Sequence, residues 1–194
     1  EDSMSQFVVH DPESAPVEAR QTLAAVKKKF GFLPNIMGIF AEAPSLLNSY
    51  LTLSEQFEAS SLSHEEQQVV LLTASHENAC SYCMAAHTTI SKMMKVPNAT
   101  LKALREGAPL ADSRLEALRV FTTRVISKLG WVEEKELQEF LEAGWGRQQA
   151  LEVVLGIGLK TLSNYTNHLT HTELDQAFEA NAWSPKSAGK AADV

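Results

Sequence analysis

The spacing of apolar residues is the feature that most limits what this chain can fold into. Over most of the sequence, apolar side chains recur every three or four positions, which places them on one face of an α-helix. Runs that alternate apolar and polar residues, as a half-buried strand requires, are scarce. The pattern therefore predicts an all-α, multi-helix protein, and no segment is a candidate for a sheet.

Helix start and stop signals divide this pattern into separate helices. Ser63 and Glu66 have the spacing of a capping box. Asn78 is expected to cap a helix that follows a break at 77–79. Several helices end at glycine, which readily adopts the left-handed conformation common at helix C-termini. The predicted helices cover about 16–30, 36–41, 44–59, 64–77, 78–94, 97–107, 112–129, 133–143 and 147–170.

The length of the chain suits a single domain. With 194 residues it can bury a substantial core without disulfide bonds. We expect an N-terminal segment over 1–15, one all-α domain over 16–180 and a flexible tail over 181–194. The tail is rich in Ser, Ala, Gly and Lys, a composition that favours disorder.

Composition and charge indicate in which compartment the protein works and which classes of partner it does not bind. The formal net charge is −7 and no basic stripe is present, so nucleic acid is not an expected partner. No apolar run approaches the roughly 20 residues that cross a bilayer, and the first residues lack the features of a signal peptide. We therefore expect a cytoplasmic protein, in a compartment where thiols stay reduced.

The two cysteines of the chain form one C-x-x-C motif, Cys80 and Cys83. So small a loop adds little stability when closed, and in a reducing compartment the motif indicates redox or metal chemistry. If a helix begins near Asn78, both thiols lie in its first turn, where unpaired N–H groups and the helix dipole favour a thiolate. His87 shares a helix face with Cys83 and can accept its proton. Cys83 is favoured as the attacking thiol, with Cys80 resolving the intermediate.

Other interpretations of these residues remain open. The cysteines can be small hydrophobes in a core. Together with His76 and His87 they also have the chemistry of zinc ligands, although eleven helical residues span roughly 16 Å, too far for one ion. Glu77 is a candidate proton relay or a solvated carboxylate.

An internal similarity at a shift of 84 residues suggests a repeated helical unit. Gln68, Cys80, Cys83 and His87 align with Glu152, Asn164, Asn167 and His171. If the repeat is real, its second copy has lost the thiols and kept structural amides.

At the C-x-x-C segment the chain resembles the alkylhydroperoxidase D-like group of the carboxymuconolactone decarboxylase family, and in particular its peroxidase-related subgroup. The match is to N-x-C-x-Y-C-x-x-x-H, here Asn78, Cys80, Tyr82, Cys83 and His87. Supporting pieces are the stretches 31–35 and 161–168 together with Asp175, so that the resemblance covers roughly residues 16–178.

The resemblance implies an all-α fold and a homo-oligomer, often a trimer or hexamer. It implies reduction of organic or hydrogen peroxide through a C-x-x-C disulfide cycle, with Cys83 as the peroxide-reactive thiol, Cys80 as its partner and His87 in a proton relay. An external dithiol or protein reductant must reopen the disulfide, and no haem, flavin or metal is required. The alternatives are a general disulfide oxidoreductase and a non-catalytic redox sensor or oligomeric binding protein.

The chain departs from the family pattern at one position. The relay glutamate of the family lies 12 residues before the first cysteine, where this chain has Gln68. An amide can orient a water but cannot accept a proton at neutral pH. Either Glu77 replaces the missing carboxylate or peroxide reduction is slow, in which case Gln68→Glu is expected to raise it.

Overall fold

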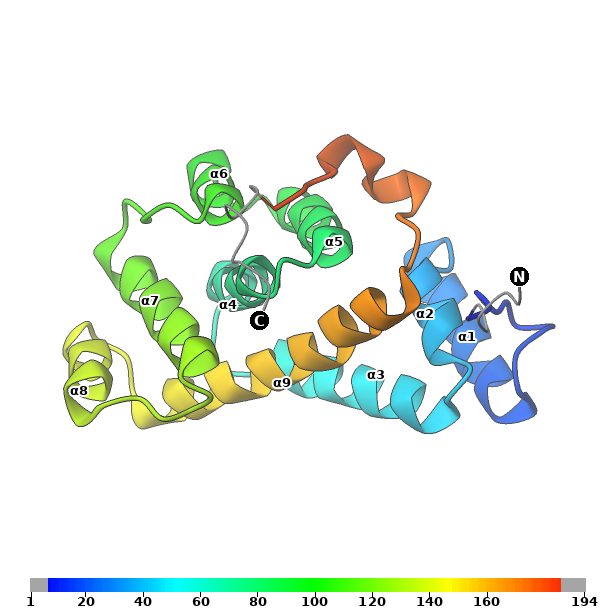
Figure 1. Cartoon of the computed structure of the whole chain (residues 1–194), viewed down its shortest axis with the longest axis horizontal. Coiled ribbons are helices and arrows are strands. Elements are labelled where there is room, and N and C mark those ends of the chain that lie inside the picture. Colours follow the sequence, from blue (N-terminus) through cyan, green and yellow to red (C-terminus); the bar gives the residue numbers. More distant parts are fainter. Residues whose placement is uncertain (1–6, 186–194) are drawn as a thin grey trace, which may run out of the picture.

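The computed structural model describes residues 7–185, and every regular element in that range is a helix. This confirms the all-α prediction (Figure 1). The elements are α1 (Val17–Phe30), α2 (Asn35–Phe40), α3 (Pro44–Glu58), α4 (His64–Glu77), α5 (Ser81–Met93), α6 (Asn98–Glu106), α7 (Ser113–Ser127), α8 (Glu134–Glu142), α9 (Arg147–Thr170) and the 3-10 helix η1 (Gln176–Asn181).

Most of the predicted boundaries are confirmed to within two residues. Gly31 and Gly107 end α1 and α6 with φ values of 79° and 65°, in the left-handed region. Ser63 and Glu66 form the predicted capping box at the start of α4. Asp112 caps α7 through a hydrogen bond from the backbone N–H of Leu115.

The boundary between α4 and α5 differs from the prediction. Asn78 ends α4 instead of starting α5, because the chain turns at Ala79, whose φ is 53°. The backbone N–H of Cys80 donates to Ser75 O at 2.9 Å and that of Ala79 donates to His76 O at 2.9 Å. This pair of bonds is a Schellman motif, here with alanine at the position usually taken by glycine.

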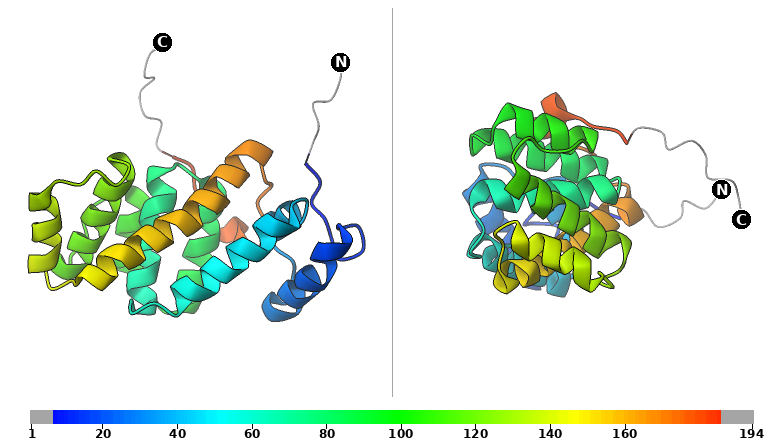
Figure 2. Two further views of the ribbon diagram at one scale, coloured as in Figure 1. Left: turned by 90° about the horizontal axis from the view of Figure 1, so that it is seen from below. Right: turned by 90° about the vertical axis from the view of Figure 1, so that its left-hand side faces the viewer.

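The helix α4 is central and packs against α5, α6, α7 and α9. Figure 1 shows α7 and α8 at one end of the molecule and α1 to α3 at the other, with α9 running between them. Figure 2 shows the same long helix lying across the molecule next to α3. A Cβ at Gly156 would lie 2.8 Å from side-chain atoms of both Phe57 and Val70, so this glycine permits the close approach of α9 to α3 and α4.

The ends of the described region are attached to the helical body. Trp183 Nε1 donates to Arg105 O at 2.8 Å, and Asn181 Oδ1 accepts from Lys92 Nζ at 2.5 Å. The prediction of a flexible tail from residue 181 is therefore wrong for these first residues, while 186–194 lie outside the described part. At the other end, His10 N donates to Gly38 O at 3.2 Å.

The proposed internal repeat is not confirmed. In the first unit the chain breaks between α4 and α5, whereas α9 continues without interruption from Arg147 to Thr170 over the corresponding positions. No helix within residues 7–185 has both the length and the apolar character needed to cross a membrane.

A candidate active site at a buried thiol pair

The two thiols lie at the start of α5, inside the protein. Cys80 is the N-cap residue of α5, and Cys83 lies in its first turn. The prediction that both belong to the first turn is thus right for Cys83 and one residue off for Cys80. Both are free cysteines, with exposed fractions of 1% and 3%. The unpaired N–H groups at the helix N-terminus favour negative charge on Cys83.

One face of α9 supplies polar groups to this thiol pair. Asn167 Nδ2 donates to Cys83 Sγ at 3.3 Å and lies 3.8 Å from Cys80 Sγ. Ser163 Oγ lies 3.7 Å from Cys83 Sγ. Lys160, Ser163 and Asn167 are spaced by three and four residues, so they share one helix face. Sequence reasoning treated Asn167 as a structural amide and did not single out Ser163 or Lys160.

Lys160 connects the thiols to a row of hydrogen bonds that runs from α9 to α4. Its side chain is 1% exposed, and its Nζ lies 2.9 Å from His87 Nε2. His87 Nδ1 lies 3.1 Å from Gln68 Oε1, which also accepts from Ser91 Oγ at 3.2 Å. The amide oxygen can only accept, so His87 carries its proton on Nδ1 and accepts from Lys160 through Nε2.

This arrangement separates the acidities of the two thiols. A hydrogen bond from Cys80 holds the pKa of Cys83 well below its ordinary value, and the positive charge of Lys160 lowers it further against the opposing effect of burial. The pKa of Cys80 is raised because its proton is shared with Cys83 and its sulfur is buried. A single proton shared by the pair therefore favours Cys80, and a single negative charge favours Cys83.

His87 is a neutral imidazole in this site. Burial lowers its pKa well below the ordinary value, and the neighbouring Lys160 charge lowers it further. Gln68, at the position of the family's relay glutamate, lies on α4 next to α5, and its Oε1 lies 3.1 Å from His87 Nδ1. The other ring nitrogen of His87, Nε2, contacts Lys160 Nζ.

Glu77, which the sequence offered as a candidate proton relay, does not lie at the thiols, and this corrects that expectation. It is exposed, and its Oε1 accepts from Thr123 Oγ1 on α7 at 3.2 Å. Glu77 and Gln68 are nine positions apart on α4, or about two and a half turns, so they point to opposite sides of the helix. Gln68 faces α5, and Glu77 faces α7.

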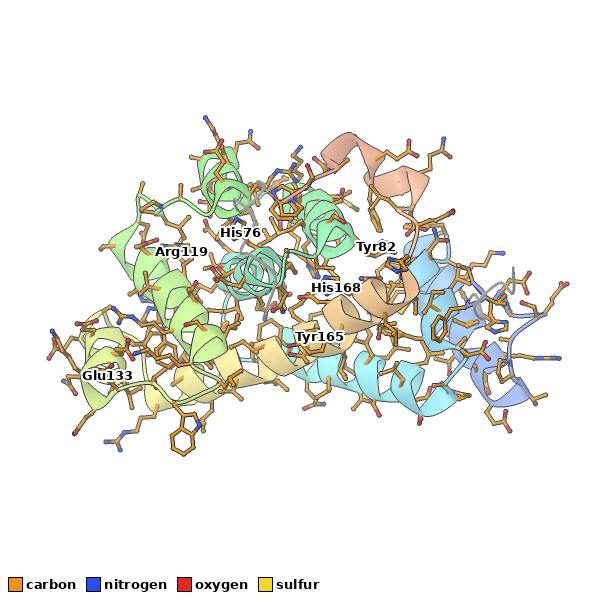
Figure 3. The ribbon with its side chains drawn as sticks, viewed as in Figure 1. His76, Tyr82, Arg119, Glu133, Tyr165 and His168 are labelled. Atoms are coloured by element: carbon orange, nitrogen blue, oxygen red, sulfur yellow. The ribbon has the colours of Figure 1, made fainter. Side chains whose placement is uncertain are left out.

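Tyr82, between the cysteines, is fixed by a buried carboxylate. Its hydroxyl donates to Asp175 Oδ2 at 2.5 Å, and Asp175 also accepts from the backbone N–H of Asn35 at 3.1 Å. Separate parts of the sequence that carry the family resemblance, 31–35, Tyr82 and Asp175, thus meet at one point. Their contact ties α2 and the segment after α9 to the start of α5, on the side of the molecule where Figure 3 labels Tyr82 and His168.

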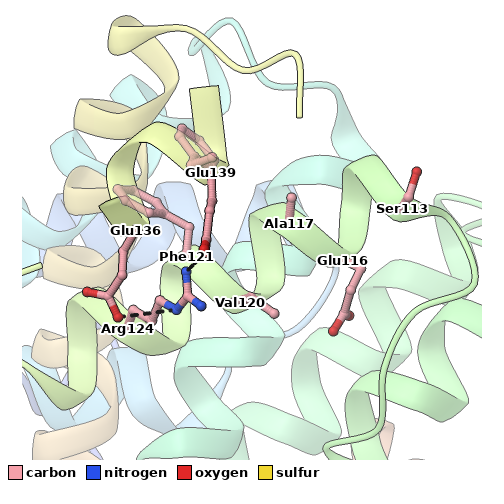
Figure 4. Close-up of a pocket in the computed structure, with 9 residues that line it drawn as sticks. Ser113, Glu116, Ala117, Val120, Phe121, Arg124, Glu136 and Glu139 are labelled. Atoms are coloured by element: carbon pink, nitrogen blue, oxygen red, sulfur yellow. Dashed lines mark hydrogen bonds and ion pairs between the residues drawn. The ribbon is translucent and has the colours of Figure 1, made fainter. Parts of the chain in front are cut away.

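A hollow of about 230 Å³ opens beside Cys80, and its lining includes Tyr82, Asn167, His168 and His171. A second hollow of about 220 Å³, between α7 and α8, contains no thiol and is bordered by Arg124, Glu136 and Glu139 (Figure 4).

Within residues 7–185 no cluster of three or more His, Cys, Asp or Glu side chains is placed to hold a metal ion. The ring of His76, a candidate zinc ligand, packs against Trp183 at 5.6 Å.

Part of this chain, including the site, is similar to a known protein family. The model of the carboxymuconolactone decarboxylase family matches residues 44–123, a range that includes both cysteines and His87. The crystal structure of the alkylhydroperoxidase core of a peroxidase-related protein from Ralstonia eutropha JMP134 is similar, with a TM-score of 0.79 and 21% identity over 96% of this chain and 100% of that one. No match was found among curated proteins.

Two further solved structures have the same fold. A peroxidase-related protein from Silicibacter sp. TM1040 gives a TM-score of 0.76 and 19% identity over 90% of this chain and 93% of that one. A cysteine-to-alanine variant of the debrominase Bmp8, in complex with 2,3,4-tribromopyrrole, gives a TM-score of 0.76 and 17% identity over 93% and 97% of the two chains. The resemblance to the carboxymuconolactone decarboxylase family is confirmed over residues 44–123, and the alkylhydroperoxidase-like fold that it implies is confirmed over most of the chain.

Proposed function

We propose that the protein is a thiol-dependent peroxide reductase. The Cys83 thiolate attacks the terminal oxygen of R–O–O–H, the O–O bond breaks, and R–O⁻ leaves to become an alcohol. Cys83 is then a sulfenic acid. Cys80 attacks its sulfur, forming the Cys80–Cys83 disulfide and releasing water. An external dithiol reduces this disulfide by thiol exchange, which fits the cytoplasmic location expected from the sequence.

The observation that carries this proposal is the unequal pair of thiols. Cys83 has a lowered pKa and Cys80 a raised one. A thiolate is the nucleophile in such chemistry, whereas a neutral thiol beside it is suited to the second, resolving step. Asn167 Nδ2 lies within 4 Å of both sulfurs. Cys80 and Cys83 are therefore close enough to the same side chain for both steps to take place at one site.

The surroundings of Asn167 support access by a small polar substrate. Asn167 lines the hollow beside Cys80. Its Oδ1 is buried and, among the described residues, has no hydrogen-bond partner. A buried acceptor without a partner is costly, and the O–H of a hydroperoxide can donate to it. We propose that Asn167 orients the peroxide in this way.

We also propose a homo-oligomer that uses the outer face of α9, a trimer or hexamer by family resemblance. Apolar side chains on this face are strongly exposed, namely Leu151 (72%), Val154 (52%), Tyr165 (59%) and Leu169 (69%). Exposed apolar groups in a row along one helix mark an association surface. Tyr165 is labelled on this helix in Figure 3.

The direct test is turnover of an alkyl hydroperoxide with a dithiol donor. Cys83→Ser should lose all turnover above the rate without enzyme. Cys80→Ser should give at most one turnover and then accumulate over-oxidised Cys83, seen by mass spectrometry, because no thiol remains to resolve the sulfenic acid. Ser127→Ala, at an exposed serine on α7 away from the thiols, is the matched control and should retain activity. Undiminished turnover by Cys83→Ser would refute the proposal.

A second candidate is reductive debromination, favoured by the similarity to debrominase Bmp8. In that reaction Cys83 would attack bromine, the carbon–bromine bond would break and the carbanion would take a proton. Cys80 would then displace bromide from sulfur and form the same disulfide. Release of bromide from a tribromopyrrole, measured beside peroxide consumption and reduction of a model disulfide, distinguishes the two functions and a general disulfide oxidoreductase.

A further inference from the structure

Lys160 is a buried cation without a carboxylate partner. Its side chain is 1% exposed, and none of the ion pairs between lysine, arginine or histidine and carboxylates in the described chain includes it. An unpaired ammonium in a protein interior is unfavourable unless another anion compensates it. His87, its hydrogen-bond partner, is neutral and cannot supply that charge.

The anion within reach is the Cys83 thiolate. Lys160 is on the same face of α9 as Ser163 and Asn167, both of which lie within hydrogen-bonding distance of Cys83 Sγ. We propose that Lys160 is the charge partner of Cys83: its buried ammonium keeps the thiol ionised, and this cationic residue takes the place of the relay carboxylate that the family resemblance would put at Gln68.

The contacts of Lys160 explain why an amide is suitable at position 68. Gln68 Oε1 accepts from His87 Nδ1, which leaves His87 Nε2 free to accept from Lys160. A carboxylate at position 68 would favour protonation of His87, and an imidazolium could not accept from the ammonium. Gln68 and His87 are thus positioning residues that hold the Lys160 side chain beside the thiol.

The same ammonium can complete the proton balance of the proposed reaction. When R–O⁻ leaves, a proton from Lys160 gives R–OH and a neutral amine. When the external dithiol later reduces the disulfide, its two protons go to Cys80 and Lys160, and the thiolate–ammonium pair is restored. This step rests on the proposed peroxide chemistry, whereas the ion pair itself does not.

Other titratable groups around the pair do not provide a competing charge. Tyr50 on α3 faces Lys160, and burial raises its pKa, so it remains a neutral phenol. The pKa of Tyr82 on α5 is likewise raised by burial and by Asp175. Asp175 is engaged by Tyr82 and Asn35. The pKa of Lys160 is raised despite burial, chiefly because of the Cys83 thiolate.

These shifts define the pH range over which the pair stabilises the fold. The lowered pKa of Cys83 adds stability above the unfolded value of about 8.5, and this is lost as pH falls through the folded value. The raised pKa of Lys160 adds stability below the unfolded value of about 10.4, and this is lost as pH rises through the folded value. The full contribution is therefore expected between about pH 8.5 and 10.4.

The test is the titration of the thiolate by its ultraviolet absorbance in the reduced protein. This requires neither peroxide nor a reagent that reaches the buried sulfur. Lys160→Met should raise the apparent pKa of Cys83 by about 1 to 3 units, the effect of a removed opposite charge nearby. Lys160→Arg keeps the charge and should retain most of the shift. Lys128→Met, at a solvent-accessible lysine, is the matched control and should leave the titration unchanged.

A folded Lys160→Met protein with the wild-type titration curve would overturn the inference. If that variant does not fold, Cys83→Ser and Cys80→Ser are compared by thermal unfolding at pH 7. Loss of the thiolate leaves Lys160 unpaired, so Cys83→Ser should melt at a lower temperature than Cys80→Ser, which removes a neutral thiol. Equal melting temperatures would show that Lys160 has no charge partner at Cys83. Failure of peroxide turnover alone would leave this inference intact.

Discussion

Two lysines of this protein show how location determines what a charge can do. Lys128, at the end of α7, is bound by Glu136 at 2.8 Å and by Glu133 at 3.1 Å, and its side chain is 33% exposed. Lys160, in the middle of α9, is enclosed and bonded to a neutral imidazole. Both have raised pKa values, Lys128 because of hydrogen bonds to carboxylates and Lys160 because of the thiolate, against the effect of burial.

The two lysines differ in how many oppositely charged partners surround them. At the α7–α8 end, Arg124 also pairs with Glu136 and Glu139, so that several charges of each sign share one solvent-accessible network (Figure 4). Water and salt can replace any one of its members. Lys160 depends on a single ionisable sulfur. The α7–α8 network therefore acts as a polar surface, while the charge of Lys160 is available to change the chemistry of Cys83.

The largest expected difference comes from reversing each charge. Lys160→Glu places a carboxylate beside the Cys83 thiolate in a dry interior and should destabilise the reduced protein by about 3 to 5 kcal/mol, the typical cost of an uncompensated buried charge. Lys128→Glu should have a much smaller effect, because water solvates the new carboxylate. Urea unfolding at pH 7 measures both. Similar losses for the two variants would contradict the distinction drawn here.

The fold was largely predictable because its signals are local. Apolar spacing, the capping box at Ser63 and glycines such as Gly31 act within a few residues. The turn before Cys80 was misplaced for two reasons. Ala79 adopts a left-handed conformation that is unusual for alanine. Asn78 is of a residue type that commonly begins helices, although here it ends one. The flexible tail was predicted from composition, but Trp183 is held by a carbonyl far away in sequence.

The candidate site was predictable only for residues near the motif. Cys80, Cys83 and His87 share one helix, so their spacing indicates their relationship. Lys160 is more than 70 positions away, and its contact with His87 depends on how α9 crosses α5. One signal was available: Lys160 lies on the face of α9 that also carries Gly156 and Asn167, and a lysine on a buried helix face needs a partner.

A substitution at position 68 should change peroxide turnover rather than the stability of the fold, and its effect should be smaller than that of reversing the charge of Lys160. With Lys160 present, Gln68→Glu should change peroxide turnover by less than about tenfold, because it disturbs His87 without adding a missing charge. In a Lys160→Met background the same change should raise turnover by at least about tenfold, since proton relays usually contribute 10² to 10⁴. Steady-state kinetics of the single and double variants tests this. A large gain from Gln68→Glu alone would instead support the carboxylate relay expected from the sequence.

The smallest effect is expected at the α7–α8 network. Glu139 accepts from Arg124 at 2.6 Å, and their side chains are 46% and 31% exposed. Glu139→Gln should cost no more than about 1 kcal/mol, and less at high salt, because water screens an exposed pair and Arg124 retains Glu136. The Cys83 titration should be unchanged, since no contact joins this network to the thiols within the described residues. Thermal unfolding at two salt concentrations, with thiolate titration on the same samples, measures both quantities. A shift in the titration would mean that the two charge clusters are coupled, and that the network at the α7–α8 end is more than a polar surface.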